Sequence, residues 1–270
     1  MVRKVRRNKT KPSWWTLPNA LALFFCCTPS IPGWAAPEEI QVYMDEMNAP
    51  GEFGLDVHNN YVVSGNGVPD YRGAQAPRHV FRVTPEFSYG LTPNLELGAY
   101  ILSSVDANGG SSIDGQKLRL KFIAPKDKDQ AYFWGANLEV GRVAHRLDEN
   151  PWNAELKGIL GYRTGPWTYA VNLNIDWKVS GPVPSPTTLD VDTKISYKTD
   201  RGYELGIESY NELGAVRQLG HLNQQSQTIF GVIDTSIRGW DVNIGVGRGL
   251  TPASDRWLLK AIVSVPLRDL

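Results

Sequence analysis

The sequence has little cysteine and no long apolar run. Its two cysteines, Cys26 and Cys27, are adjacent and lie near the N-terminus of a chain of 270 residues. No segment beyond them approaches the roughly 18 apolar residues that a transmembrane helix requires. Membrane-spanning helices are therefore excluded for the remainder of the chain. Disulfides are excluded as well if the N-terminal part is removed.

The N-terminus has the pattern of an export signal. Six Lys or Arg side chains fall within the first eleven residues, and the short apolar stretch Leu17–Cys27 follows them. Gly33, Trp34 and Ala35 then offer small residues for signal peptidase. We expect residues 1–35 to be a cleaved signal peptide, because the apolar stretch is too short to anchor the chain in a membrane.

The expected cleavage changes the charge balance. The full chain has 28 basic and 28 acidic side chains, and loss of the six basic ones leaves 22 against 28, a net charge of −6. A basic surface is the electrostatic signature of nucleic-acid binding. We therefore expect no nucleic-acid partner.

The segment Trp167–Lys178 alternates between apolar and polar or small residues without an error. Successive side chains of a strand point to opposite faces, so this segment has one apolar and one polar face. The apolar face has aromatic residues at its ends and aliphatic residues between them. This order is typical of a lipid-facing strand, because Trp and Tyr prefer the two membrane–water interfaces.

Similar segments recur down the chain. Gly and Pro clusters divide it into about twelve pieces of about ten residues, the length of a tilted membrane strand. These pieces are 53–61, 81–89, 95–101, 117–122, 132–141, 152–162, 167–178, 189–198, 203–208, 227–237, 240–247 and 257–265. Segment 227–237 is apolar on both faces, so its orientation is ambiguous. Pro85 lies inside a strand and removes a ladder hydrogen bond, which predicts a bulge there.

The links between these segments alternate in length. Short ones such as 164–166 and 238–239 are mostly followed by longer, polar ones such as 65–77 and 214–225. This is the asymmetry of an outer-membrane barrel, with short periplasmic turns and long outer loops. The predicted fold is an all-β, transmembrane, antiparallel up-and-down β-barrel of about twelve strands, formed by residues 52–270. Residues 36–51 would be a periplasmic lead-in or a short extra strand, or a short plug.

A soluble secreted β-sandwich is the alternative, because its strands alternate in the same way. Three features favour the membrane barrel: nearly every strand alternates, the polar face is charged along its length, and aromatic residues gather at strand ends. The tryptophans predicted to form an aromatic girdle are Trp134, Trp152, Trp167, Trp177, Trp240 and Trp257. Closure also removes unpaired edges, which hydrocarbon would penalise.

The polar rows of the strands supply the candidate lumen-lining residues. These are Arg82, Glu86, Lys117, Arg119, Lys121, Glu139, Asp176, Asp190, Asp192, Glu204 and Glu208. A basic wall at 117–121 facing an acidic wall at 190–208 would select solutes by charge. In the alternative interpretation, these charges pair with their neighbours and merely fill the lumen.

The turns Tyr89–Leu97 and Gly249–Asp255, together with the export signal and the amphipathic strands, resemble outer-membrane β-barrels of Gram-negative bacteria. The likeness is closest to the group linked to phenol-degradation pathways, which are thought to be transporters or channels. The resemblance implies an outer-membrane location and assembly by the barrel-assembly machinery. It also implies contact with outer-membrane lipid.

We therefore expect a non-enzymatic channel or transporter that passes small solutes by passive diffusion. A lipid-modifying hydrolase and a structural barrel that displays its loops are the alternatives. A hydrolase would need a serine and a histidine within hydrogen-bond reach. No nucleophile motif surrounds His58, His79, His145 or His221. The sequence has no metal-ligand spacing, phosphate loop or cofactor fingerprint, so no cofactor is expected.

Overall fold

The computed structural model describes residues 39–267. The expected signal peptide at 1–35 and the last three residues of the expected barrel domain lie outside this range. Within the described range, no helix is long and apolar enough to cross a membrane.

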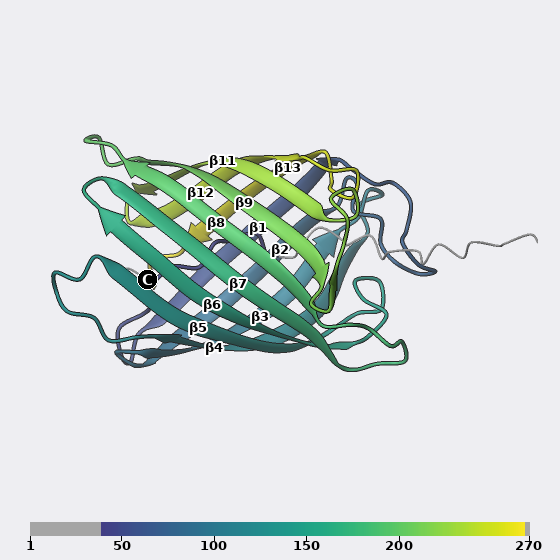
Figure 1. Ribbon diagram of the computed structural model, residues 1–270, viewed down its shortest axis with the longest axis horizontal. Coiled ribbons are helices and arrows are strands. Elements are labelled where there is room, and N and C mark those ends of the chain that lie inside the picture. The colour runs from purple at the N-terminus through teal and green to yellow at the C-terminus, as the bar shows by residue number, and fades with distance from the viewer. Residues whose placement is uncertain (1–38, 268–270) are drawn as a thin grey trace, which may run out of the picture. The chain divides into compact units, whose positions relative to one another are not determined.

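Twelve antiparallel strands form a closed barrel (Figure 1). Each strand pairs with the next, β8 pairs with β9, and β13 returns to pair with β1. The short β10 (Gln218–Leu219) lies in a loop and extends only β9. The predicted class and the predicted strand number are confirmed. The barrel strands are β1 (Phe53–Ser64), β2 (Phe81–Thr92), β3 (Leu95–Val105), β4 (Ser111–Ile123), β5 (Tyr132–Val143), β6 (Trp152–Thr164), β7 (Trp167–Ser180), β8 (Thr188–Lys198), β9 (Glu204–Ala215), β11 (Ser226–Ile237), β12 (Trp240–Gly249) and β13 (Trp257–Ser264).

The alternation of the sequence becomes the two faces of the wall. In β5, Trp134 and Leu138 point outward and are 49% and 41% exposed. Their neighbours Phe133, Asn137 and Glu139 point inward and are buried. An outer surface of exposed apolar side chains is unfavourable in water, whereas hydrocarbon accommodates it.

The links also follow the expected pattern. Arg238 and Gly239 join β11 to β12, and both have positive φ, as a two-residue hairpin turn of the primed type requires. The link 124–131 between β4 and β5 lies at the same end of the barrel and is longer, so the asymmetry of the links is not strict.

The prediction of a bulge at Pro85 is wrong. Pro85 pairs with Val57 in an uninterrupted β1–β2 ladder. On the other side, the β2–β3 register is the same at Val83–Ser103 and at Glu86–Tyr100, so no extra residue is inserted. The strand tolerates the missing N–H by a local gap in pairing with β3 rather than by a change of register.

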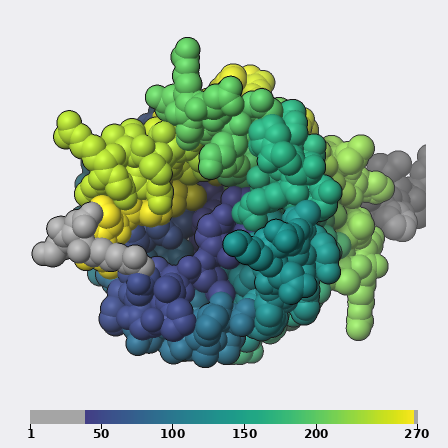
Figure 2. All heavy atoms as spheres, turned by 90° about the vertical axis from the view of Figure 1, so that its left-hand side faces the viewer, coloured from purple at the N-terminus to yellow at the C-terminus, as the bar shows by residue number. Residues whose placement is uncertain are grey.

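Residues 39–50 form no strand; their only bridge joins Pro50 to Gly90. They run through the inside of the barrel, and we call them the lumen segment. Their atoms, in the darkest purple, lie within the ring of strands when the barrel is viewed along its axis (Figure 2).

Candidate functional site: the lumen and the segment inside it

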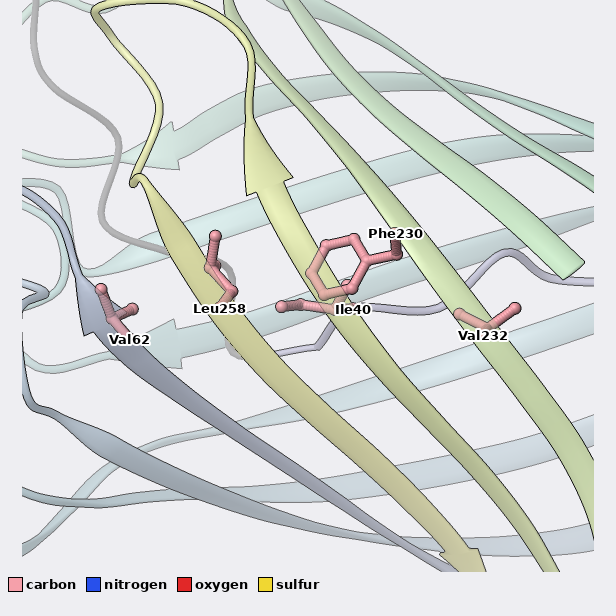
Figure 3. Packing of buried hydrophobic residues seen from close by; sticks show 5 residues of the cluster. All are labelled: Ile40, Val62, Phe230, Val232 and Leu258. Carbon is pink, nitrogen blue, oxygen red and sulfur yellow. The ribbon is translucent and has the colours of Figure 1, made fainter.

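The lumen segment begins in an apolar patch. Ile40 packs with Val62, Phe230, Val232 and Leu258, inward-facing residues of β1, β11 and β13 (Figure 3). This contact settles the orientation of β11, which the sequence left ambiguous. Its inward face is apolar because it meets an apolar residue of the chain itself, while Ile229 and Ile233 face outward.

Tyr43 occupies the middle of the lumen. Its backbone N–H donates to Asn172 Oδ1 at 2.6 Å, and its carbonyl accepts from Asn172 Nδ2 at 2.9 Å. Its hydroxyl lies 2.7 Å from that of Tyr100 and 2.7 Å from Glu39 Oε1. Because both backbone groups and the hydroxyl have partners, this buried residue carries little desolvation penalty.

Three cations surround the Tyr43 ring. The Lys157 ammonium lies 4.6 Å from the ring centroid, Lys121 lies at 5.2 Å and Arg119 at 5.8 Å. Cations at these distances are attracted by the negative face of an aromatic ring. The ring thereby joins side chains of β4 and β6, the two strands on either side of β5.

The later part of the segment is held by charge. Asp45 forms ion pairs with Lys126 and with Arg163. The Lys121 ammonium donates to the Glu46 carbonyl at 2.7 Å. The Asn48 amide and side chain donate to Glu96 Oε2 at 2.6 Å and 2.8 Å. The segment is therefore fixed along its whole described length.

The segment leaves the lumen against Gly90. The Gly51 N–H donates to the Gly90 carbonyl at 2.8 Å, and Gly90 N–H donates to the Glu52 carbonyl at 3.0 Å. A Cβ on Gly90 would lie only 2.3 Å from the Ala49 carbonyl oxygen. Glycine is required here because two backbones meet closely.

Arg119 is the centre of a buried ion cluster in the wall. Its guanidinium bonds to Glu86 and lies 2.8 Å from Glu96 Oε1. Glu86 also faces His58, whose Nε2 lies 3.0 Å from Glu86 Oε2. Arg119, Glu86 and His58 are each at most 5% exposed.

Most of the other predicted lumen-lining residues also have partners. Arg82 is buried and also interacts with another group of the protein. Lys117 lies 3.9 Å from Glu139, and Asp192 accepts from Asn174 at 2.7 Å. Glu204 bonds to Ser196, and Glu208 to Lys260 and Lys194. In these walls, Lys117, Arg119 and Glu208 form ion pairs, whereas Lys121, Asp192 and Glu204 bond to neutral groups.

A group of acids at the long-loop end of the lumen differs from the rest. The carboxyl group of Asp190 contacts that of Asp176, and Glu212 is its register partner on β9. One oxygen of each of these three acids, and Asn174 Oδ1, is buried without a hydrogen-bond partner among the described residues. We call these four residues the acidic cluster. Because two carboxyl groups in contact share a proton, the cluster carries less negative charge than three ionised acids would.

The tryptophans assigned to a girdle lie near strand ends. Trp152 and Trp257 begin strands at the long-loop end of the barrel, and Trp177 lies toward the same end of β7. Trp134, Trp167 and Trp240 lie at the opposite end. All but Trp177 are more than 40% exposed.

The four histidines make contacts other than the pairing with a serine that a hydrolase requires. His58 faces two carboxylates. His79 stacks on Tyr61, and His145 lies edge-on to Tyr71. His221 lies in the loop after β10, where its backbone N–H donates to Gln224 Oε1 at 3.0 Å.

Several residues of the site were not among those predicted from the sequence. Glu39 and Tyr43 belong to the lumen segment, and Tyr100, Asn172 and Lys260 of the wall bind it. Their partners lie up to 220 residues away, as in the bond from Lys260 Nζ to the Ile40 carbonyl at 3.1 Å. The one available signal was the apolar inward face of 227–237, which implied an apolar partner inside the barrel.

Comparison with known proteins places the fold. No family model and no curated sequence matches this chain. Among solved structures, it is similar to the COG4313 outer membrane channel from Pseudomonas putida F1, with 14% identity, a TM-score of 0.58, and 84% of this chain and 99% of that one covered. It is also similar to the KdgM porin in complex with disordered oligogalacturonate, with 9% identity, a TM-score of 0.51, and 78% and 97% covered. The chain has the fold of these outer-membrane channel barrels.

Proposed function

We propose that the protein is a passive channel of a Gram-negative outer membrane, through which small polar solutes pass along the lumen. The observation that carries the proposal is the division of the wall into an apolar outer face and a charged inner face around an enclosed interior. Barrels of about twelve strands are wider than those that side chains alone fill, so they leave room for an internal pathway. The shared fold with two channels supports the same function.

The lumen segment is the element that controls this pathway. It crosses the interior between β7 and the strands that carry Tyr100 and Lys121. We infer that conduction is low while the segment is docked and rises when it leaves.

The acidic cluster gives the pathway its charge preference. Solutes that enter from the long-loop end meet Asp176, Asp190 and Glu212 before they reach the middle of the lumen. Carboxylates that line a pore favour cations. The channel should therefore pass cations in preference to anions.

Reversal potentials in planar bilayers under a salt gradient test both parts of the proposal. The wild type should conduct and favour cations, and the double variant Asp176→Asn/Asp190→Asn should lose much of that preference. Asp200→Asn, in the turn between β8 and β9, is the matched control and should behave as the wild type. Absence of conductance in correctly folded protein would contradict the channel function. An unchanged preference in the double variant would remove the acidic cluster from the pathway.

A further inference from the structure

Three potential metal ligands converge where the lumen segment meets the wall. Glu39 comes from the segment, His58 from β1 and Glu86 from β2. One ligand atom of each lies within 4.8 Å of the other two. We propose that Glu39, His58 and Glu86 bind a divalent first-row transition-metal ion, with Zn²⁺ as the representative.

The distances suit a single ion. His58 Nε2 lies 3.0 Å from Glu86 Oε2 and 3.9 Å from Glu39 Oε1. Ligands bound at about 2.0–2.1 Å around a tetrahedral zinc ion are about 3.3 Å from each other. The observed separations fall on both sides of this value, so small side-chain movements complete the site.

The surrounding contacts orient the two carboxylates. Arg119 binds Oε1 of Glu86, which leaves Oε2 to face His58. The Tyr43 hydroxyl donates to Glu39 Oε1 at 2.7 Å and fixes the direction of that carboxylate. Such outer contacts hold metal ligands in place and tune their affinity.

The donor set selects the class of metal. An imidazole nitrogen with two carboxylate oxygens suits zinc, iron, cobalt or nickel, whereas magnesium and calcium prefer oxygen ligands throughout. A neutral imidazole and two carboxylates also balance the charge of a divalent ion. Three protein ligands leave a fourth position for water.

The competing interpretation is an ion pair between an imidazolium and the two carboxylates. An imidazolium has two N–H donors, and within residues 39–267 an acceptor faces Nε2 alone. His58 is 2% exposed, and its Nδ1 has no hydrogen-bond partner among the described residues. The Nδ1–H lacks a partner in either case, but burying it on a full imidazolium costs more than burying it on a neutral imidazole bound to a metal.

A bound ion would join the lumen segment to the wall, because one ligand lies on the segment and two lie on strands. It would act as a latch that keeps the segment docked. This consequence rests on the proposed function, since it assumes that the docked segment lowers conduction. Metal binding itself does not depend on that assumption.

The test separates binding from conduction. Full-length processed protein in detergent is stripped with EDTA and titrated with Zn²⁺ by calorimetry, and the Co²⁺ form is examined by visible absorption. The wild type should bind one equivalent and give the Co²⁺ spectrum of a nitrogen and oxygen site. Glu39→Gln and His58→Gln should each weaken binding at least tenfold, while His145→Gln, the same change in an outer loop, should leave it unchanged.

Glu39→Gln guards against misfolding, because Glu39 lies outside the strands of the barrel. Absence of stoichiometric binding by the wild type, or binding by both variants as tight as that of the wild type, would overturn the site. Binding that survives Glu39→Gln but not His58→Gln would overturn the three-ligand site. In bilayers, Zn²⁺ should lower the conductance of the wild type but not that of Glu39→Gln. Calorimetric binding without any effect on conductance would support the metal site and contradict the role proposed for the segment.

Discussion

The side-chain amide of Asn172 bonds to both backbone groups of Tyr43, accepting from its N–H at 2.6 Å and donating to its carbonyl at 2.9 Å. A single wall residue thus supplies Tyr43 with the two hydrogen bonds that a neighbouring strand would otherwise provide. Asn172 is fully buried, so neither bond competes strongly with water. This pair is the most specific contact between the lumen segment and the wall.

Asn172→Ala should release the segment more often. Each lost hydrogen bond contributes about 1 kcal/mol, so the docked state should weaken by about 2 kcal/mol, or about thirtyfold. Single-channel recordings should show a larger open fraction. Asn211→Ala is the control, because the Asn211 amide bonds to Val191 and Ser209 of the wall and not to the segment. Equal behaviour of the two variants would contradict the role of Asn172.

Ile40→Asn should undock the beginning of the segment. The change removes apolar burial of about 2 kcal/mol and places an amide in the apolar patch formed with Phe230 and Val232. Glutamyl endopeptidase should then cleave at Glu39 or Glu46 faster than in the wild type, as detected by mass spectrometry. Ile40→Leu retains the apolar volume and should resist cleavage like the wild type. Equal resistance of Ile40→Asn would show that this patch does not hold the segment.

Arg119→Ala should strongly destabilise the barrel. It leaves Glu86 and Glu96 buried without their shared cation, and breaking a buried ion pair from one side costs about 3–5 kcal/mol. Urea unfolding of the protein in lipid vesicles measures the loss. Arg142→Ala is the control, because Arg142 is exposed on the outer face of β5 and should change stability by less than about 0.5 kcal/mol.

The contact between two outer loops should weaken as the pH rises. Asp255 Oδ1 accepts from the Asn66 N–H at 3.1 Å, and burial raises the pKa of Asp255 to about 6 from its ordinary 3.8. An acid whose pKa is raised while the two loops are in contact binds its proton more tightly in that state than when they are apart. The contact between the two loops is therefore most stable below about pH 4, and it loses stability as the pH rises through 6.

Hydrogen exchange of the amides at 65–67 measures this contact, after correction for the intrinsic effect of pH on exchange. Protection should fall between pH 4 and pH 6 in the wild type. Asp255→Asn cannot titrate and should show a flat profile. A wild-type profile that is equally flat would mean that the charge of Asp255 does not govern the contact.

The barrel could be predicted from the sequence because its signal is local. Each strand repeats a period of two residues, and every second residue of Trp167–Lys178 faces outward in β7 as expected. The hairpin turn at Arg238 and Gly239 is local too. Pro85 misled the prediction because a proline can be tolerated by a gap in one ladder instead of a bulge.

The lumen segment could not be predicted in the same way. Residues 39–50 have no period, and their partners on β2, β4, β7 and β13 are brought together only when the barrel closes. The pairing of the wall charges is likewise a matter of register between strands. Glu86 and Arg119 belong to strands that are not adjacent, and no sequence spacing relates them.

The most direct test replaces residues 40–47 with a flexible Gly-Ser stretch of the same length and compares single-channel conductance with that of the wild type. The replacement removes Ile40, Tyr43 and Asp45 while it preserves every strand of the barrel. Heat-modified gel migration confirms that the variant is folded. A severalfold larger and steadier conductance is the predicted result. An unchanged conductance in the folded variant would contradict the claim that this segment lowers conduction.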